Sequence, residues 1–216
     1  TSAQTTGLKT DQIGAIETDD LRALNSASLR AFSTDQLGAL GSDQLGALTS
    51  AQVNALTSQQ LRGLSSDDLN ALTTDQFRLM SSTQVGAIGT DQIKTLTTDD
   101  LAAISTAGIK GLSSNQLGAL TTDEVVAMTT QQFAALGSAQ TAGLTTDQIA
   151  NLQSDDLRAL SSAALSKFST DQMGALGSDQ IAALTPAQIA ALPTTPQNLL
   201  ANLTTDEIQA LPTAQV

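Results

Sequence analysis

Apolar residues recur along the chain with a period of eight. Residues 1 to 192 divide into 24 consecutive octads in unbroken register. Leu, Ile, Phe or Met occupies position 8 of every octad, and position 5 is apolar except at Thr5 and Thr141. A spacing of three places two side chains on one face of a helix, whereas a strand would show alternation. The pattern therefore predicts short α-helices with positions 5 and 8 facing a core.

These helices cannot join into one continuous helix. Eight residues at about 100° each advance the apolar pair by roughly 80° per octad, so the stripe would spiral around the helix. A helix of two turns is also too short to be stable alone, so each one must stack on its neighbours. We predict an all-α fold, a superhelical solenoid of very short capped helices, one per eight-residue repeat. Positions 5 and 8 face inward, and positions 3, 4 and 6 are expected to face water.

Polar residues at the start of each octad predict where the helix begins. In "LTTDQIANL", Thr145 can be the N-cap, Gln148 the return arm of a capping box, and Leu144 can pack onto Ile149. Pro186 fits the first helical position in that frame. Position 2, however, is Ser or Thr in every octad but one. That near-constancy favours an N-cap one residue later.

Glycines and charges follow the same octad frame. Four glycines at position 1 follow an apolar position 8 and predict left-handed helix ends: Gly41, Gly89, Gly137 and Gly177. Acids lie at positions 3 or 4 except for Glu17, and seven of the nine basic residues lie at position 6. This order complements the helix dipole. Position 7 is Ala or Gly in 20 of the 24 octads, which would let a neighbouring backbone approach closely.

The sequence also contains a repeat that is much longer than the octad. The stretch that begins at Thr1 returns at Gly137, an offset of 136 residues that pairs Phe32 with Phe168. All four Phe residues lie at position 5 or 8, so we expect them to fill the core rather than to anchor a ligand. The duplicated blocks, and a start at Thr1 without Met, suggest part of a longer array.

The octad register is interrupted near the end of the sequence. We predict three segments: an array of 24 octads at 1–192, an irregular Pro-containing insertion at 193–203, and a resumed octad with a partial repeat at 204–216. The insertion "PTTPQNLLANL" predicts a loop or kink, with a domain junction as the second interpretation.

Composition narrows the function. The 216 residues are 40% hydrophobic and 2% aromatic, carry a formal charge of -12, and include no Cys, His, Trp or Tyr. This excludes thiol nucleophiles, imidazole bases and disulfides, and leaves an enzyme as a distant third hypothesis. The acidic balance disfavours nucleic acid and membrane surfaces, and no apolar run is long enough for membrane insertion. No small-molecule substrate is evident.

Paired acids are the only candidate metal ligands: Asp19 with Asp20, Asp67 with Asp68, Asp99 with Asp100, and Asp155 with Asp156. Oxygen ligands of this kind suit calcium. Adjacent helical residues point apart, however, and acids at a helix start are explained by the dipole. We favour the solvated-face interpretation and predict no metal, no cofactor and no catalytic residue. Ser and Thr are expected to cap helices, since no activating base accompanies them.

The octad phrases at Leu144–Leu152 and Leu176–Leu192 resemble the octapeptide-repeat tracts of very large bacterial surface and secreted proteins, often labelled haem-utilisation or adhesion proteins. The resemblance covers nearly the whole chain and implies an extracellular, Gram-negative cell-surface setting. The residues that commonly ligate haem iron, His, Cys and Tyr, are missing from the sequence, which disfavours haem binding.

These observations lead to two functional hypotheses. The first is a non-enzymatic extracellular structural protein, a stalk or fibre-forming tract of a bacterial adhesin or surface appendage, with end-to-end self-association into a filament as its expected partner interaction. The alternative is a solenoid binding module that recognises a peptide or glycan through positions 3, 4 and 6.

Overall fold

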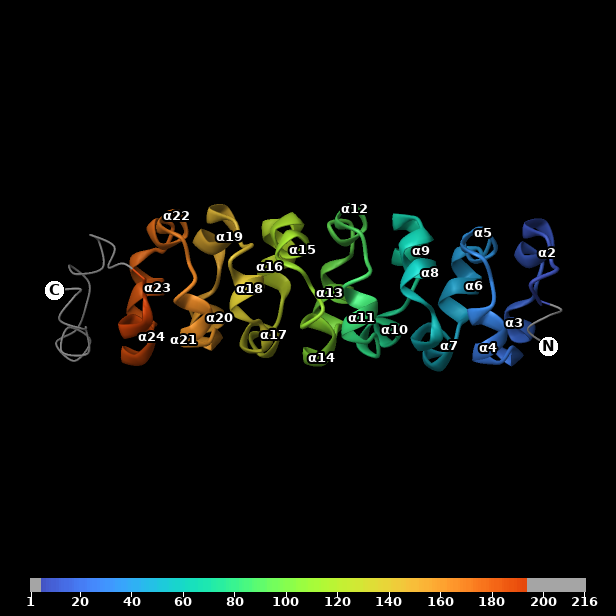
Figure 1. Ribbon diagram of the computed structural model, residues 1–216, viewed down its shortest axis with the longest axis horizontal. Helices are drawn as coiled ribbons and strands as arrows, with labels where there is room; N and C mark the ends of the chain where they lie inside the picture. The colour runs from blue at the N-terminus through green and yellow to red at the C-terminus, as the bar shows by residue number, and fades with distance from the viewer. Residues whose placement is uncertain (1–4, 194–216) are drawn as a thin grey trace. The chain divides into compact units, whose positions relative to one another are not determined.

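The computed structural model describes residues 5–193, and within this range the chain is helical with no strand. Each octad from residue 9 to residue 192 forms one helix of four to six residues. Figure 1 shows these helices joined by short connectors. This confirms the predicted all-α solenoid with one helix per repeat. The predicted segments 193–203 and 204–216 lie outside the described residues, apart from Pro193.

The helices keep the octad spacing throughout. The first thirteen are α2 Thr10–Gly14, α3 Thr18–Ala23, α4 Ser26–Arg30, α5 Thr34–Leu37, α6 Ser42–Ala47, α7 Ser50–Ala55, α8 Ser58–Gly63, α9 Ser66–Asn70, α10 Thr74–Arg78, α11 Ser82–Val85, α12 Thr90–Ile93, α13 Thr98–Ala103 and α14 Thr106–Ile109. The other ten are α15 Ser114–Ala119, α16 Thr122–Ala127, α17 Thr130–Ala135, α18 Ser138–Thr141, α19 Thr146–Asn151, α20 Ser154–Ala159, α21 Ser162–Leu165, α22 Thr170–Gly174, α23 Ser178–Ala182 and α24 Pro186–Ala191.

The chain divides into two compact units, Thr1–Gly111 and Leu112–Val216. In both units a helix packs against the helix three octads later. Examples are α3 on α6 and α10 on α13 in the first unit, and α17 on α20 and α18 on α21 in the second. Stacking at this interval gives every short helix the tertiary support that it lacks alone.

The core of each unit is made by positions 5 and 8. Every position 5 residue from Thr5 to Ile189 is buried, and so is every position 8 residue from Phe32 to Leu192. All four Phe side chains are buried, as expected for core residues. The polar exceptions donate to carbonyl oxygens, since the Thr5 hydroxyl lies 3.4 Å from the Ser28 oxygen and the Thr141 hydroxyl 3.4 Å from the Ala164 oxygen.

The N-cap of each helix lies one residue earlier than the near-constant Ser or Thr at position 2 predicted. The N-cap is position 1 in α2 to α24, as in α19, where the Thr145 side chain accepts from the Gln148 N–H. The N-cap prediction at position 2 is therefore wrong, and the alternative at Thr145 is right. Both positions carry hydroxyls, so the sequence alone does not separate them.

The glycines at position 1 are also different from the prediction. Gly41, Gly89, Gly137 and Gly177 have extended backbones and serve as N-caps, with φ between -68 and -88°. No glycine among the described residues has a positive φ. The left-handed helix ends were therefore wrong. Before Gly137, the C-cap of α17 is Leu136, which is extended and has a buried side chain.

This N-cap register can be tested by two adjacent substitutions. Thr145→Ala removes the hydroxyl that caps α19, and we expect a loss of about 1 kcal/mol of stability in thermal unfolding followed by circular dichroism. Thr146→Ala removes the neighbouring hydroxyl at position 2 and should change stability by less than about 0.5 kcal/mol. Equal losses in the two variants would contradict the assigned cap.

The helices meet along a seam between position 6 of one octad and position 7 of the octad three later. The Arg22 Nε donates to the Ala47 oxygen at 2.9 Å, and the Asn70 Nδ2 donates to the Thr95 oxygen at 2.8 Å. Where position 6 is glycine, the same carbonyl approaches the backbone itself, as the Ala71 oxygen does at Gly46. Position 7 shows the close backbone approach that the sequence predicted at Gly143, where a Cβ would overlap the Ser114 backbone.

Candidate functional site

The most frequent polar device in the structure is the glutamine at position 4. Its Oε1 accepts the backbone N–H of its own N-cap residue, as Gln52 does from Thr49 at 2.8 Å. The N-cap hydroxyl of Thr49 in turn accepts the N–H of Gln52 at 3.3 Å, which completes a capping box. One end of the amide is therefore used to start its own helix.

The other end of the same amide binds a different helix. The Gln52 Nε2 donates to the Leu21 oxygen at 2.8 Å and to the Leu24 oxygen at 2.7 Å. These oxygens belong to positions 5 and 8, four octads earlier, at the end of a helix, where the Leu21 oxygen also accepts the Leu24 N–H at 3.1 Å. We call this arrangement the glutamine clip. It ties the start of one helix to the end of another.

The glutamine clip recurs in both units. Nε2 lies 2.6 to 3.2 Å from the position 8 oxygen 28 residues earlier in twelve octads, those of Gln36, Gln44, Gln52, Gln60, Gln76, Gln84, Gln92, Gln140, Gln148, Gln172, Gln180 and Gln188. Helices stack three octads apart, and the clip reaches the fourth octad back. One superhelical turn within a unit therefore takes between three and four octads.

Position 4 does not face water, contrary to the prediction. From Ser28 onward every position 4 residue among the described residues is buried except Asp68, which is half-buried. The octad pattern did not reveal this, because a capping box alone is compatible with a solvated side chain. One signal was present: position 4 has 16 Gln and a single Glu. A capping box accepts either residue, whereas only Gln has the donor that the clip needs.

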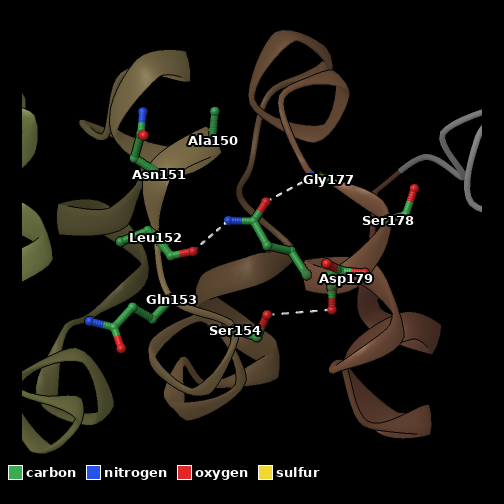
Figure 2. Close-up of a pocket in the computed structure, with 9 residues that line it drawn as sticks. Ala150, Asn151, Leu152, Gln153, Ser154, Gly177, Ser178 and Asp179 are labelled. Atoms are coloured by element: carbon green, nitrogen blue, oxygen red, sulfur yellow. Dashed lines mark hydrogen bonds between the residues drawn. The ribbon is translucent and has the colours of Figure 1, made fainter.

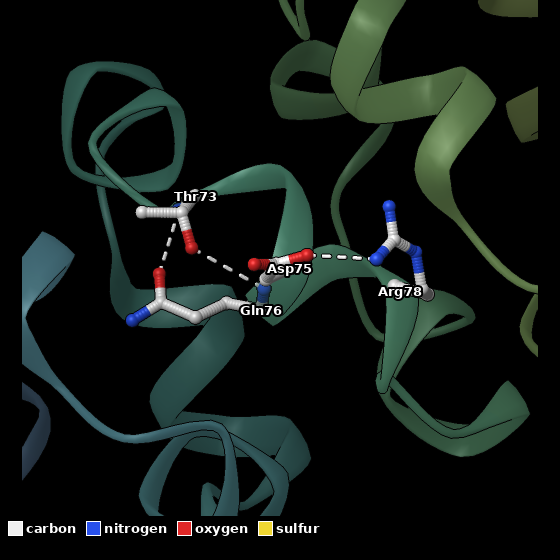
Figure 3. A network of polar contacts seen from close by, with 4 residues as sticks. All are labelled: Thr73, Asp75, Gln76 and Arg78. Carbon is white, nitrogen blue, oxygen red and sulfur yellow. Dashed lines mark hydrogen bonds and ion pairs between the residues drawn. The ribbon is translucent and has the colours of Figure 1, made fainter.

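Position 3, in contrast, faces water as predicted. Figure 3 shows Gln76 paired with its N-cap Thr73, while the neighbouring Asp75 points outward to Arg78 at 2.7 Å. A second pair of this kind joins Asp91 to Lys94, which lowers the pKa of Asp91. Both pairs are exposed and span three residues of one octad, so they add little stability.

The paired acids are divided between these two environments. The four acids at position 3, Asp19, Asp67, Asp99 and Asp155, are exposed. At position 4, Asp20 is exposed, Asp68 is half-buried, and Asp100 and Asp156 are buried. Burial raises the pKa of Asp100 and that of Asp156, while hydrogen bonds from Thr97 and Thr130 oppose the increase. In these last two pairs the two acids thus lie on different sides of the helix. Among residues 5–193 no three acidic, His or Cys side chains are grouped to hold a metal.

Shallow polar grooves run beside the clips. The groove in Figure 2, of about 550 Å³, is lined by Leu152 and Ser154 on one side and by Gly177 and Asp179 on the other. The clip of Gln180 crosses it from the Gly177 N–H to the Leu152 oxygen. An equivalent groove of about 600 Å³ lies between Ile16–Thr18 and Gly41–Gln44. Its lining residues precede those of the first groove by 136 positions, the length of the long repeat. Both grooves thus carry two hydroxyls and an aspartate at matching places, and the second groove adds the carboxylate of Glu17.

These groups offer no evident catalytic arrangement. The Ser154 hydroxyl in the groove donates to the Asp179 backbone oxygen at 3.4 Å, and Asp179 is exposed. A serine nucleophile needs a base held against its hydroxyl, which this contact does not supply. No helix among the described residues is long and apolar enough to cross a membrane.

The helices, their clips and their stacking interval define the chain as an α-solenoid repeat protein. The family model of the ALTTAQ repeat matches six overlapping segments, residues 13–50, 48–78, 64–98, 96–130, 125–154 and 149–186. These matches cover most of the sequence, and the chain belongs to the ALTTAQ repeat family. No curated protein matches it.

Proposed function

We propose that the chain is a non-enzymatic structural tract, a stalk or fibre-forming part of an extracellular adhesin or surface appendage of a Gram-negative bacterium. The glutamine clip is the observation that carries this proposal. Each clip joins octads of the same kind, so an added octad finds the same partners as the one before it. An array with this property can be lengthened by duplication without redesign.

The surface supports a structural role in the same way. The hydroxyls at position 1 cap helices, the glutamines at position 4 are buried from Gln36 to Gln188, and exposed position 3 repeats Asp, Ala, Gln, Asn or Thr. The binding-module hypothesis relied on exposed residues at positions 3, 4 and 6. Because position 4 is buried, only positions 3 and 6 remain available to a ligand. The remaining grooves repeat from octad to octad and provide little that is specific to one ligand.

Self-association belongs to the same proposal. The contacts that place one helix on the helix three octads later use apolar side chains and backbone groups common to all octads. A second copy offers the same groups. We therefore expect copies to stack end to end and to form a filament.

Electron microscopy of the purified chain over a concentration series tests the structural role. We expect particles that lengthen as concentration rises, and sedimentation velocity should show the same trend. Compact particles of constant size at every concentration would contradict a fibre-forming tract. Specific retention of one polysaccharide or peptide on a binding array would favour the binding module instead.

Cell-surface location requires a separate experiment. Immunogold labelling of intact cells that carry the sequence is expected to decorate their outer surface. Labelling that appears only after the cells are permeabilised would contradict an extracellular setting, and it would leave the structural role itself unaffected.

A further inference from the structure

The array of glutamine clips is interrupted inside the second unit. Position 4 carries Asp156 and then Ala164 in two consecutive octads, between the clips of Gln148 and Gln172. By the spacing of the other clips, a Gln at position 156 would bind the carbonyl oxygens of Val125 and Met128 at the end of α16. No glutamine clip reaches these two oxygens, because position 156 is not a glutamine.

Asp156 is buried in spite of its charge. Its side chain is 3% exposed, and the Thr130 hydroxyl of α17 donates to its Oδ1 at 2.7 Å. No ion pair involves Asp156 within the described part of the chain. A carboxylate here has lost most of its water, and the Thr130 hydroxyl alone does not replace it, which is an unfavourable setting for an ionised group.

The surrounding charges do not compensate for this burial. The neighbouring helix α17 carries no titratable residue, α23 carries only Asp179, and α16 carries the two acids Asp123 and Glu124. On α20 itself, Asp155 adds negative charge and Arg158 is exposed. Desolvation accordingly raises the pKa of Asp156, the Thr130 hydrogen bond lowers it, and Asp155 raises it further.

We propose that Asp156 is a pH-dependent latch that holds α20 to α17 and to the end of α16. When ionised, it sets a buried negative charge in the place where other octads have an amide donor for carbonyl oxygens. When protonated, it loses the desolvation cost and the repulsion from those oxygens, so the octads pack as tightly as in the clipped regions. The latch follows from the fold and does not rest on the proposed structural role.

The direction of the pH effect follows from the raised pKa. Because the folded state binds the proton more tightly than the unfolded state, the contribution of Asp156 is fully present below the ordinary Asp pKa of about 4. It is lost as pH rises through the higher folded pKa. Asp100 in the first unit is also buried, at 6% exposed, but it accepts at 2.6 Å from Thr97, the N-cap of its own helix, and so does not join two helices.

Asp156→Gln, compared with wild type at several pH values, tests the latch. At pH 7 the new amide can form the missing clip, and we expect the melting temperature to rise by roughly 2–4 °C. The gap between variant and wild type should shrink as pH falls to about 3.5, where the wild-type acid is protonated. Hydrogen exchange of the α17 and α20 amides should slow in the variant at pH 7.

The control is Asp155→Asn, which removes the same charge from an exposed position of the same helix. Its difference from wild type should be small and should vary little with pH. If Asp156→Gln does not fold, Asp156→Asn carries the test, because it keeps the side-chain size and does not titrate. The latch would be overturned if the difference in melting temperature between the position 156 variant and wild type did not change with pH. It would also be overturned if Asp155→Asn gave the same pH-dependent difference.

Discussion

Alanine in place of Gly143 is expected to destabilise the second unit by about 3 kcal/mol. Gly143 lies at position 7 on the seam between α15 and α18. A Cβ there would overlap the backbone carbonyl group of Ser114, which is backbone and cannot rotate away. The clash would separate the two helices and expose position 5 and 8 side chains around them. Urea unfolding followed by circular dichroism would measure the loss.

Gly174→Ala is the matched control, since a Cβ at Gly174 meets nothing within 4 Å. Alanine is the better helix former, and we expect this variant to be neutral or slightly more stable, by at most about 1 kcal/mol. The same substitution thus has opposite outcomes at two glycines of one unit. If both variants unfolded at the same urea concentration, the close contact at Ser114 would be wrong.

Octad position alone does not explain the difference between Gly143 at position 7 and Gly174 at position 6, because a Cβ at Gly118, also at position 6, would meet a backbone oxygen. The sequence predicted that position 7 is small so that a backbone can approach, and Gly143 confirms it. It did not predict which octads need glycine rather than alanine. That depends on the residue 25 positions earlier: Gly118 precedes Gly143 at this interval, and the Gly143 oxygen lies 2.5 Å from an ideal Cβ on Gly118. Two glycines together bring the backbones closest.

Local features of the octad were more predictable than contacts between octads. Positions 5 and 8 form the core because their spacing is a local property of one helix. The glutamine clip was missed because its acceptors lie 28 and 31 residues earlier, and nothing within one octad indicates them. The cap register was missed for another reason, since hydroxyls at positions 1 and 2 are chemically equivalent in sequence.

The 136-residue repeat has a structural counterpart. Thr5 donates to the Ser28 oxygen and Thr141 donates to the Ala164 oxygen, and each pair spans 23 residues. These are the two octads in which position 5 is not apolar, and in both cases the partner at position 4 is small rather than Gln. A duplicated block therefore carries both sides of an unusual contact, which keeps the copied segment compatible with its own stacking.

Glutamate in place of Gln52 should show how much one glutamine clip contributes. Gln52 is 2% exposed, and its Nε2 lies within hydrogen-bond distance of the Leu21 and Leu24 oxygens. A carboxylate has the same shape but no donor, and it would place buried negative charge against two carbonyl oxygens. We expect a loss of about 3–5 kcal/mol at pH 7, because an unpaired buried charge is costly.

The pH dependence of the Gln52→Glu variant separates charge from shape. Burial against carbonyl oxygens should raise the pKa of the new acid, so part of the lost stability should return as pH falls and the acid becomes neutral. Gln59→Glu is the control, because position 59 is exposed in the first turn of α8, where an acid is tolerated or favoured. We expect its stability to stay within about 0.5 kcal/mol of wild type at pH 7. Equal melting temperatures for the two glutamate variants at pH 7 would mean that the clip adds no stability, and that the excess of Gln over Glu at position 4 has another cause.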